Sequence, residues 1–316
     1  MVTKPRTRKS RRLALVAALI LVVSGTALLM GFSSAYSVLG SETVGLITNA
    51  DLAVIPLFLM MGGFATASGM AADLYKLAHA LFGWLRGGLA YATIGGCAAF
   101  GSIAGTSMGT VATMGAVALP EMRQRGYSAG LITGSITAGG TLGQLVPPGT
   151  AIVVYALLVE ESIGRLYIAV LIPALLTALF YMATVGLMVR LQPSCAPGRG
   201  QFDLAEVKAA LKGATSAFIL IAAVIGGIFF GIFTATEAAA YGVVASLGLA
   251  WAGGSLTRKA FWESLMSATR LTAMIMFVLG ATSFLSVTMS FTGIPRALAE
   301  WVAALHLSPW ALIAVL

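Results

Sequence analysis

Apolar runs long enough to cross a lipid bilayer recur along the whole chain. A membrane-spanning helix needs about 20 consecutive apolar residues to cross about 30 Å of hydrocarbon. The first run, LALVAALILVVSG, starts at residue 13 and extends to about residue 31. We therefore predict an all-α, polytopic transmembrane protein, with further spans near residues 52–69, 166–191, 216–233, 234–254 and 271–291.

Composition agrees with a membrane protein and excludes a water-soluble domain. Apolar residues make up 59% of the 316 positions and charged residues 9%, and the mean hydropathy is +0.95. A soluble chain of this length could not cover so much apolar surface. A secretory signal would give one short apolar run followed by a polar chain. The sequence instead predicts several spans and no cleaved segment.

Positive charge is concentrated at the N-terminus. The net charge is +8, and six basic residues precede the first span. By the positive-inside rule this tail, residues 1–12, is expected to be cytoplasmic. A nucleic-acid-binding arm would need a folded polar domain with interleaved aromatic residues, and the chain moves directly into an apolar run. We therefore predict no nucleic-acid partner. The basic residues are Lys4, Arg6, Arg8, Lys9, Arg11 and Arg12.

The pattern of polar segments suggests two repeats. Residues 70–86 place leucines at three- and four-residue steps, which predicts an amphipathic arm helix along the membrane interface. Residues 192–203 form a hydrophilic linker between a first repeat, 13–191, and the start of a second, 204–316. An amphipathic helix followed by an apolar segment recurs at residues 256–291, a hint of internal duplication. We expect this second repeat to be incomplete, because the final apolar stretch is too short to cross a bilayer.

Two glycine-rich segments interrupt the apolar runs. They are AGTSMGT at residues 104–110 and GGTLGQLVPPGT at residues 139–150, with the polar LPEMRQRGYS between them. This order predicts a re-entrant helical hairpin at about residues 100–150, entering and leaving on one side. Unwound backbone at membrane depth occurs where it faces protein or a water-filled cavity. Broken helices there present free carbonyls to a cation and free amides to an anion.

A second interpretation of the same glycines stays open. Gly101, Gly105 and Gly109 are spaced by four residues, as are Gly139 and Gly143, and this spacing also allows transmembrane helices to pack closely. The coincidence of glycines, hydroxyl residues and a double proline in two segments favours a binding site. We assign substrate contacts to Ser107, Thr110, Gly140 and Thr141.

These segments resemble the large membrane subunit of tripartite ATP-independent periplasmic (TRAP) transporters of the dicarboxylate and sialic acid type. The resemblance covers about residues 45–316. It is carried by the motifs IPLFLMMGG, LRGGLAYATIGGCAAFGSIAGTS, LPEMRQRGYSAG, GGTLGQLVPPGTAIVVYALLVEESIGRLYIAVLIPALL and TATEAAAYGVV.

The resemblance implies a sodium-coupled elevator-type importer of organic acid anions, built from inverted repeats, in the bacterial inner membrane. It also implies two partner proteins, a small four-helix membrane subunit and a periplasmic substrate-binding protein. No cofactor other than the coupling Na⁺ is implied. Position 104 departs from the serine usual in the family, so only a backbone ligand is available there. The sodium ligands implied are Ala104, Gly105, Thr106, Gly143, Val146 and Pro148.

Other function classes find less support in the residues. An intramembrane enzyme needs clustered His, Asp or Glu near the spans, and the chain has no such cluster, so we predict that it is not an enzyme. A passive channel can also use glycine-rich re-entrant segments and stays an alternative. His79 and His306 have no companion at metal-ligand spacing. Glu237 is either an intramembrane functional carboxylate or part of a helix cap with Thr234 or Thr236, and TATEAAA favours the cap.

Overall fold

A computed structural model describes residues 24–28, 31–198, 200, 202–305 and 311. The described residues contain helices and no strand, which confirms the all-α prediction. The basic tail at residues 1–12 and most of the first predicted span lie outside the described residues. The chain divides into two compact units, residues 1–49 with 273–316, and Ala50–Thr272.

The smaller unit brings together segments far apart in sequence. The hydroxyl oxygens of Thr26 and Thr288 lie 2.7 Å apart in its interior. Residues 32–48, for which the sequence predicts no span, form a helix. The helices of this unit are α2 (Phe32–Thr48), the C-terminal part of α13 (Arg258–Phe291) and α14 (Ile294–Ala304).

The larger unit holds both glycine-rich segments. Its core is formed by fully buried large side chains of α3, α4, α5 and α6, among them Phe58, Tyr75, Phe100 and Met114. In chain order its helices are η1 (Ala50–Ala53), α3 (Val54–Ala67), α4 (Met70–Phe82), α5 (Gly88–Ala104), α6 (Ser107–Gln124), α7 (Ala129–Leu145), α8 (Thr150–Leu158), α9 (Ile163–Leu191), η2 (Pro193–Cys195), α10 (Leu204–Ile221), η3 (Ala222–Gly226), α11 (Gly227–Phe229) and α12 (Ala235–Ala252).

Within the described residues, four helical segments are long and apolar enough to cross a membrane. They are Ala50–Ala67, Ile163–Leu191, Leu204–Phe229 and Arg258–Phe291. The apolar side chains of α9 are widely exposed, with Ile172 and Phe180 each 68% accessible. An exposed apolar face of this size is stable against lipid and not against water. The protein is a multi-pass membrane protein.

Several predicted boundaries differ from the structure. The span predicted at residues 216–233 is part of a longer helical segment, Leu204–Phe229, which contains a π turn, η3. The predicted break near residue 270 is absent, because α13 continues through it. Residues 235–252 form α12, which is not among the helices apolar enough to span. Lysine, arginine and glutamate have helix propensities close to that of alanine, so a helix can continue through them.

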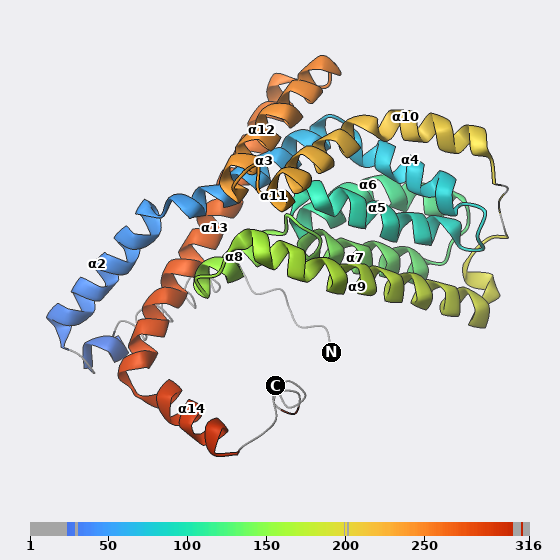
Figure 1. Cartoon of the computed structure of the whole chain (residues 1–316). Coiled ribbons are helices and arrows are strands. Elements are labelled where there is room, and N and C mark those ends of the chain that lie inside the picture. Colours follow the sequence, from blue (N-terminus) through green and yellow to red (C-terminus); the bar gives the residue numbers. More distant parts are fainter. Residues whose placement is uncertain (1–23, 29–30, 199, 201, 306–310, 312–316) are drawn as a thin grey trace, which may run out of the picture. The chain divides into compact units, whose positions relative to one another are not determined.

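Helices α5, α6 and α7 run side by side, with α9 beside α7 and α10 beside α4 (Figure 1). Glycines set the closest approaches. A Cβ at Gly101 of α5 would lie 2.6 Å from the α-carbon of Gly143 in α7, so only glycine allows these backbones to meet. Gly242 of α12 similarly leaves room for Met61 of α3. The packing interpretation of the glycine spacing is therefore correct at Gly101 and Gly143.

Candidate functional site

The first break separates α5 from α6 at two residues. Gly105 ends α5 in the left-handed region at φ 62°, where a side chain would be strained, and its Cβ would also meet the Pro148 carbonyl oxygen at 2.6 Å. Thr106 is extended and begins α6 as its N-cap, its hydroxyl accepting a bond from the Gly109 amide at 3.2 Å. The chain then runs back along α5 as α6.

The second break lies between α7 and α8, whose axes differ by 42°. It consists of Val146, Pro147, Pro148 and Gly149, and the peptide bond between the two prolines is cis. Proline has no amide hydrogen, so the carbonyls of Gly143 and Gln144 lose the donors four residues ahead of them. The double proline thus ends α7 and frees carbonyls at the same time.

Hydrogen bonds join the two breaks directly. The amide and the hydroxyl of buried Thr150 both donate to the Gly105 carbonyl, at 2.9 and 3.0 Å. The Ser107 hydroxyl donates to the side-chain carbonyl of Gln144 at 3.0 Å. The first residue of α6 and the last turn of α7 are therefore held together, and segments about 40 residues apart in sequence form one region.

The residues predicted to bind sodium all lie in this region. In the part of the chain that the structure describes, the carbonyls of Ala104, Gly143, Val146 and Pro148 accept no hydrogen bond. The other two predicted carbonyls are occupied, that of Gly105 by Thr150 and that of Thr106 by the Thr110 amide and hydroxyl at 3.1 and 2.8 Å. Unpaired carbonyl oxygens are suitable ligands for a hard cation such as Na⁺.

The residues predicted to contact substrate are divided between two environments. Thr110 and Gly140 are buried where α6 packs on α7, with Val111 against Gly140. Thr141 is exposed, and its hydroxyl lies 3.1 Å from the Tyr181 hydroxyl of α9. Ser107 bonds to Gln144, which lines the same cleft as Thr141. The structure thus gathers Ser107 and Thr141 near one cleft and leaves the other two inside the bundle.

This cleft has a volume of about 460 Å³ and lies between α7, α8 and α9. Pockets of roughly 300–1,000 Å³ are typical for small molecules. Gln144, Tyr155 and Tyr181 line this cleft and were not among the predicted site residues. Gln144 could have been identified from the sequence, because it is the only asparagine or glutamine between residues 129 and 158. The lining residues are Thr141, Gln144, Leu145, Ala151, Ile152, Tyr155, Leu166, Val170, Thr177 and Tyr181.

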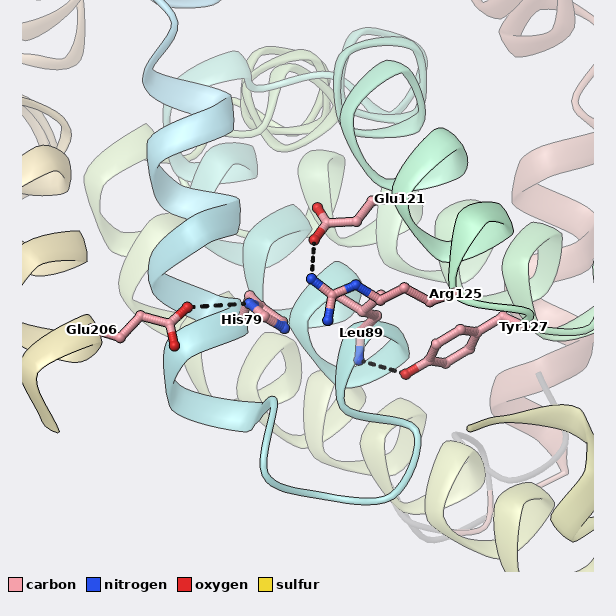
Figure 2. A network of polar contacts seen from close by, with 6 residues as sticks. All are labelled: His79, Leu89, Glu121, Arg125, Tyr127 and Glu206. Atoms are coloured by element: carbon pink, nitrogen blue, oxygen red, sulfur yellow. Dashed lines mark hydrogen bonds and ion pairs between the residues drawn. The ribbon is translucent and has the colours of Figure 1, made fainter. Parts of the chain in front are cut away.

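The opposite end of the hairpin is closed by polar contacts (Figure 2). The Leu89 amide at the start of α5 donates to the Tyr127 hydroxyl, which follows α6, at 3.1 Å. The start of α5 and the end of α6 therefore lie at one side of the bundle, and the re-entrant hairpin over residues 100–150 stays a prediction. Burial raises the pKa of Tyr127, so its phenol stays neutral at physiological pH. Nearby, Arg125 pairs with Glu121 at 3.0 Å.

A second cavity, of about 330 Å³, lies at this polar end between α4, α6 and α10. His79 of α4 faces Glu206 of α10 across 3.6 Å (Figure 2). The carboxylates around this cavity are paired, and the described residues contain no group of three or more His, Cys, Asp or Glu arranged to hold a metal ion. Of these pairs, His79–Glu206 joins two helices, whereas Asp73–Lys76 and Glu121–Arg125 each lie within one helical turn.

Glu237 belongs to a helix cap. Its amide donates to the Thr234 hydroxyl at 3.2 Å, and its carboxylate accepts from the Thr234 amide at 2.8 Å. This reciprocal pair is a capping box at the start of α12. The cap interpretation is confirmed, with Thr234 as the capping residue.

Comparison with known proteins gives one consistent family. Residues 10–316 match the family described as "Tripartite ATP-independent periplasmic transporter, DctM component". A C4-dicarboxylate TRAP transporter large permease protein of Pseudomonas aeruginosa is 35% identical over 265 residues, covering 84% of this chain and 62% of the relative. A sialic acid TRAP transporter large permease protein of Vibrio cholerae is 28% identical over 296 residues, covering 90% and 67%.

An isethionate TRAP transporter permease protein of Oleidesulfovibrio alaskensis is 31% identical over 258 residues, covering 80% of this chain and 40% of the relative. The chain spans less than two thirds of the length of the C4-dicarboxylate permeases that it matches. A match that includes nearly every residue, together with the two facing helix breaks, settles the family. The chain belongs to the DctM component family, the large permease subunits of TRAP transporters.

Proposed function

We propose that this protein is the permease subunit of a sodium-coupled secondary transporter that imports organic acid anions such as C4-dicarboxylates or sialic acid. The observation that carries the proposal is the pair of facing breaks, where the carbonyls of Ala104, Gly143, Val146 and Pro148 lack donors. An unpaired carbonyl at membrane depth costs several kcal/mol, and a bound Na⁺ offsets that cost.

The transporter would work with two partners, a small four-helix membrane subunit and a periplasmic substrate-binding protein. The names of the relatives support this arrangement, since TRAP transporters are tripartite and the isethionate relative is described as DctMQ. We place the complex in the bacterial inner membrane with the basic tail of this chain in the cytoplasm. Transport would follow an elevator mechanism, with the hairpin carried by a moving domain.

Uptake in reconstituted liposomes tests this proposal. The full-length permease, the small subunit and the binding protein are combined, and uptake of radiolabelled succinate and N-acetylneuraminate is measured with an inward Na⁺ gradient. We expect uptake of one of these anions that stops when Na⁺ is replaced by K⁺ or when the binding protein is omitted. Uptake that continues without Na⁺ and without the binding protein would contradict the proposal and support a passive channel.

A further inference from the structure

We propose that Gln144 is the residue by which this chain recognises an oxygen of the transported anion. This inference rests on the proposed function and adds a specificity-determining residue to it. Gln144 stands in the last turn of α7, one turn before the double proline, and lines the cleft of about 460 Å³. Its side chain is half-buried, so it is ordered by neighbours and still reaches the cleft.

The hydrogen-bonding capacity of Gln144 is only partly used. A carboxamide has one oxygen that accepts and one NH₂ group with two donors. The oxygen accepts the hydrogen bond from Ser107 at 3.0 Å. Among the described residues, no hydrogen bond is donated by the NH₂ group. Because Ser107 fixes the oxygen, the two free donors are oriented and available to a ligand.

The cleft around Gln144 is suited to a small anion bound without a positive charge. None of its described lining residues is charged, so recognition depends on neutral donors. The Thr141 hydroxyl donates to the Ala138 carbonyl at 2.7 Å and lies 3.1 Å from the Tyr181 hydroxyl, so the neutral donors left on this cleft are those of Gln144 and Tyr155. Hydrogen bonds from neutral donors to a carboxylate oxygen are strong in a site of low polarity. A carboxylate or sulfonate with an apolar body fits this lining.

The position of Gln144 also links recognition to the sodium region. Its backbone carbonyl is one of those freed by the double proline, and this carbonyl lies so close to Gly149 that a Cβ there would collide with it. The Gln144 backbone therefore packs directly against the break. An anion held by the carboxamide would be held by the same turn that borders the unpaired carbonyls.

Two substitutions test the side chain. Gln144→Met keeps its length and removes both donors, and Gln144→Glu keeps its shape and replaces donors by a negative charge. The full-length protein in nanodiscs is titrated with succinate, N-acetylneuraminate and isethionate, each in NaCl, and the dissociation constant is measured by thermal stabilisation. We expect a weakening of about tenfold in Gln144→Met and a larger one in Gln144→Glu.

The readouts separate recognition from folding. In Gln144→Met without anion, the NaCl concentration that gives half-maximal thermal stabilisation should stay within about twofold of its value in the unaltered protein. The reason is that this side chain supplies no predicted sodium ligand. Gln192→Glu introduces the same charge at the exposed end of α9 and should bind the anions as the unaltered protein does. If Ser107 acts through Gln144, Ser107→Ala should weaken binding in the native background and add little to Gln144→Met.

Unchanged anion affinity in Gln144→Met would overturn the inference and leave the proposed function standing. An equal loss of Na⁺ and anion stabilisation would also overturn it, because a structural role predicts that result. Absence of Na⁺-dependent binding for all three anions in the unaltered protein would contradict the proposed function itself, and the inference with it.

Discussion

The two ends of the α5–α7 bundle are built from the same chain segments but differ in how their polar groups are satisfied. At the polar end, the Leu89 amide donates a hydrogen bond to the Tyr127 hydroxyl. The Ser128 amide donates to the Cys195 carbonyl at 2.9 Å, and the Arg86 guanidinium donates to the Pro193 carbonyl at 3.0 Å. At the end with the breaks, close packing coexists with unpaired carbonyls at Gly143 and Pro148. Buried backbone groups are almost always paired. The unpaired carbonyls lie at the breaks, where the proposed sodium site would use them, and the polar end joins helices through satisfied hydrogen bonds.

The largest expected effect tests the close packing at the breaks. Gly143→Val would place a Cβ 2.7 Å from the Thr110 Cβ and 3.0 Å from the Thr106 carbonyl oxygen. We expect destabilisation of about 1–3 kcal/mol and loss of Na⁺-dependent uptake. Gly134→Ala on the same helix faces open space and is the matched control. Melting temperature and uptake are measured together, and a Gly143→Val protein that melts and transports like the control would contradict the packing described here.

The next effect concerns the polar end alone. Tyr127→Phe removes the acceptor for the buried Leu89 amide, which should cost about 1–2 kcal/mol without changing the Na⁺ concentration for half-maximal uptake. The raised pKa of Tyr127 means that its neutral form stabilises the fold below about pH 10, and this contribution is lost as the pH rises further. Tyr36→Phe, at an exposed position, is the control. A shifted Na⁺ dependence would show that the two ends are coupled.

A smaller effect on stability should accompany a specific effect on sodium. Thr150→Val keeps the shape of the side chain and the amide bond to Gly105 but removes the hydroxyl donor. We expect a loss of about 1 kcal/mol and a higher Na⁺ concentration for half-maximal uptake, because the Gly105 carbonyl keeps only one of its two hydrogen bonds and the two breaks are joined less firmly. Thr133→Val removes a hydroxyl that bonds within its own exposed helix face and should change neither. If both variants need the same Na⁺ concentration for half-maximal uptake, the Thr150 hydroxyl does not support the sodium site.

The sequence located the breaks but not the contacts between them. Glycines, hydroxyls and the double proline mark positions where a helix cannot continue, so residues 104–110 and 139–150 were predictable from local chemistry. The Gly105–Thr150 and Ser107–Gln144 bonds depend on tertiary packing, which periodicity does not encode. The continuous α10–α11 and α13 segments were missed because charged residues suggested boundaries, and α10 continues even through Gly213. The predicted two-repeat division stays a prediction.

The smallest expected effect distinguishes structural from functional charge at the polar end. Arg125 and Glu121 are one helical turn apart and partly exposed, with 52% and 34% of their side chains accessible. Such pairs contribute about 0.3–0.5 kcal/mol, and salt weakens them further. Arg125→Gln should therefore barely change the melting temperature, and the KM for anion uptake should stay unchanged at low and high ionic strength. A KM that rises severalfold at low salt and returns to normal at high salt would mean that Arg125 attracts the anion, and the polar end would then take part in transport.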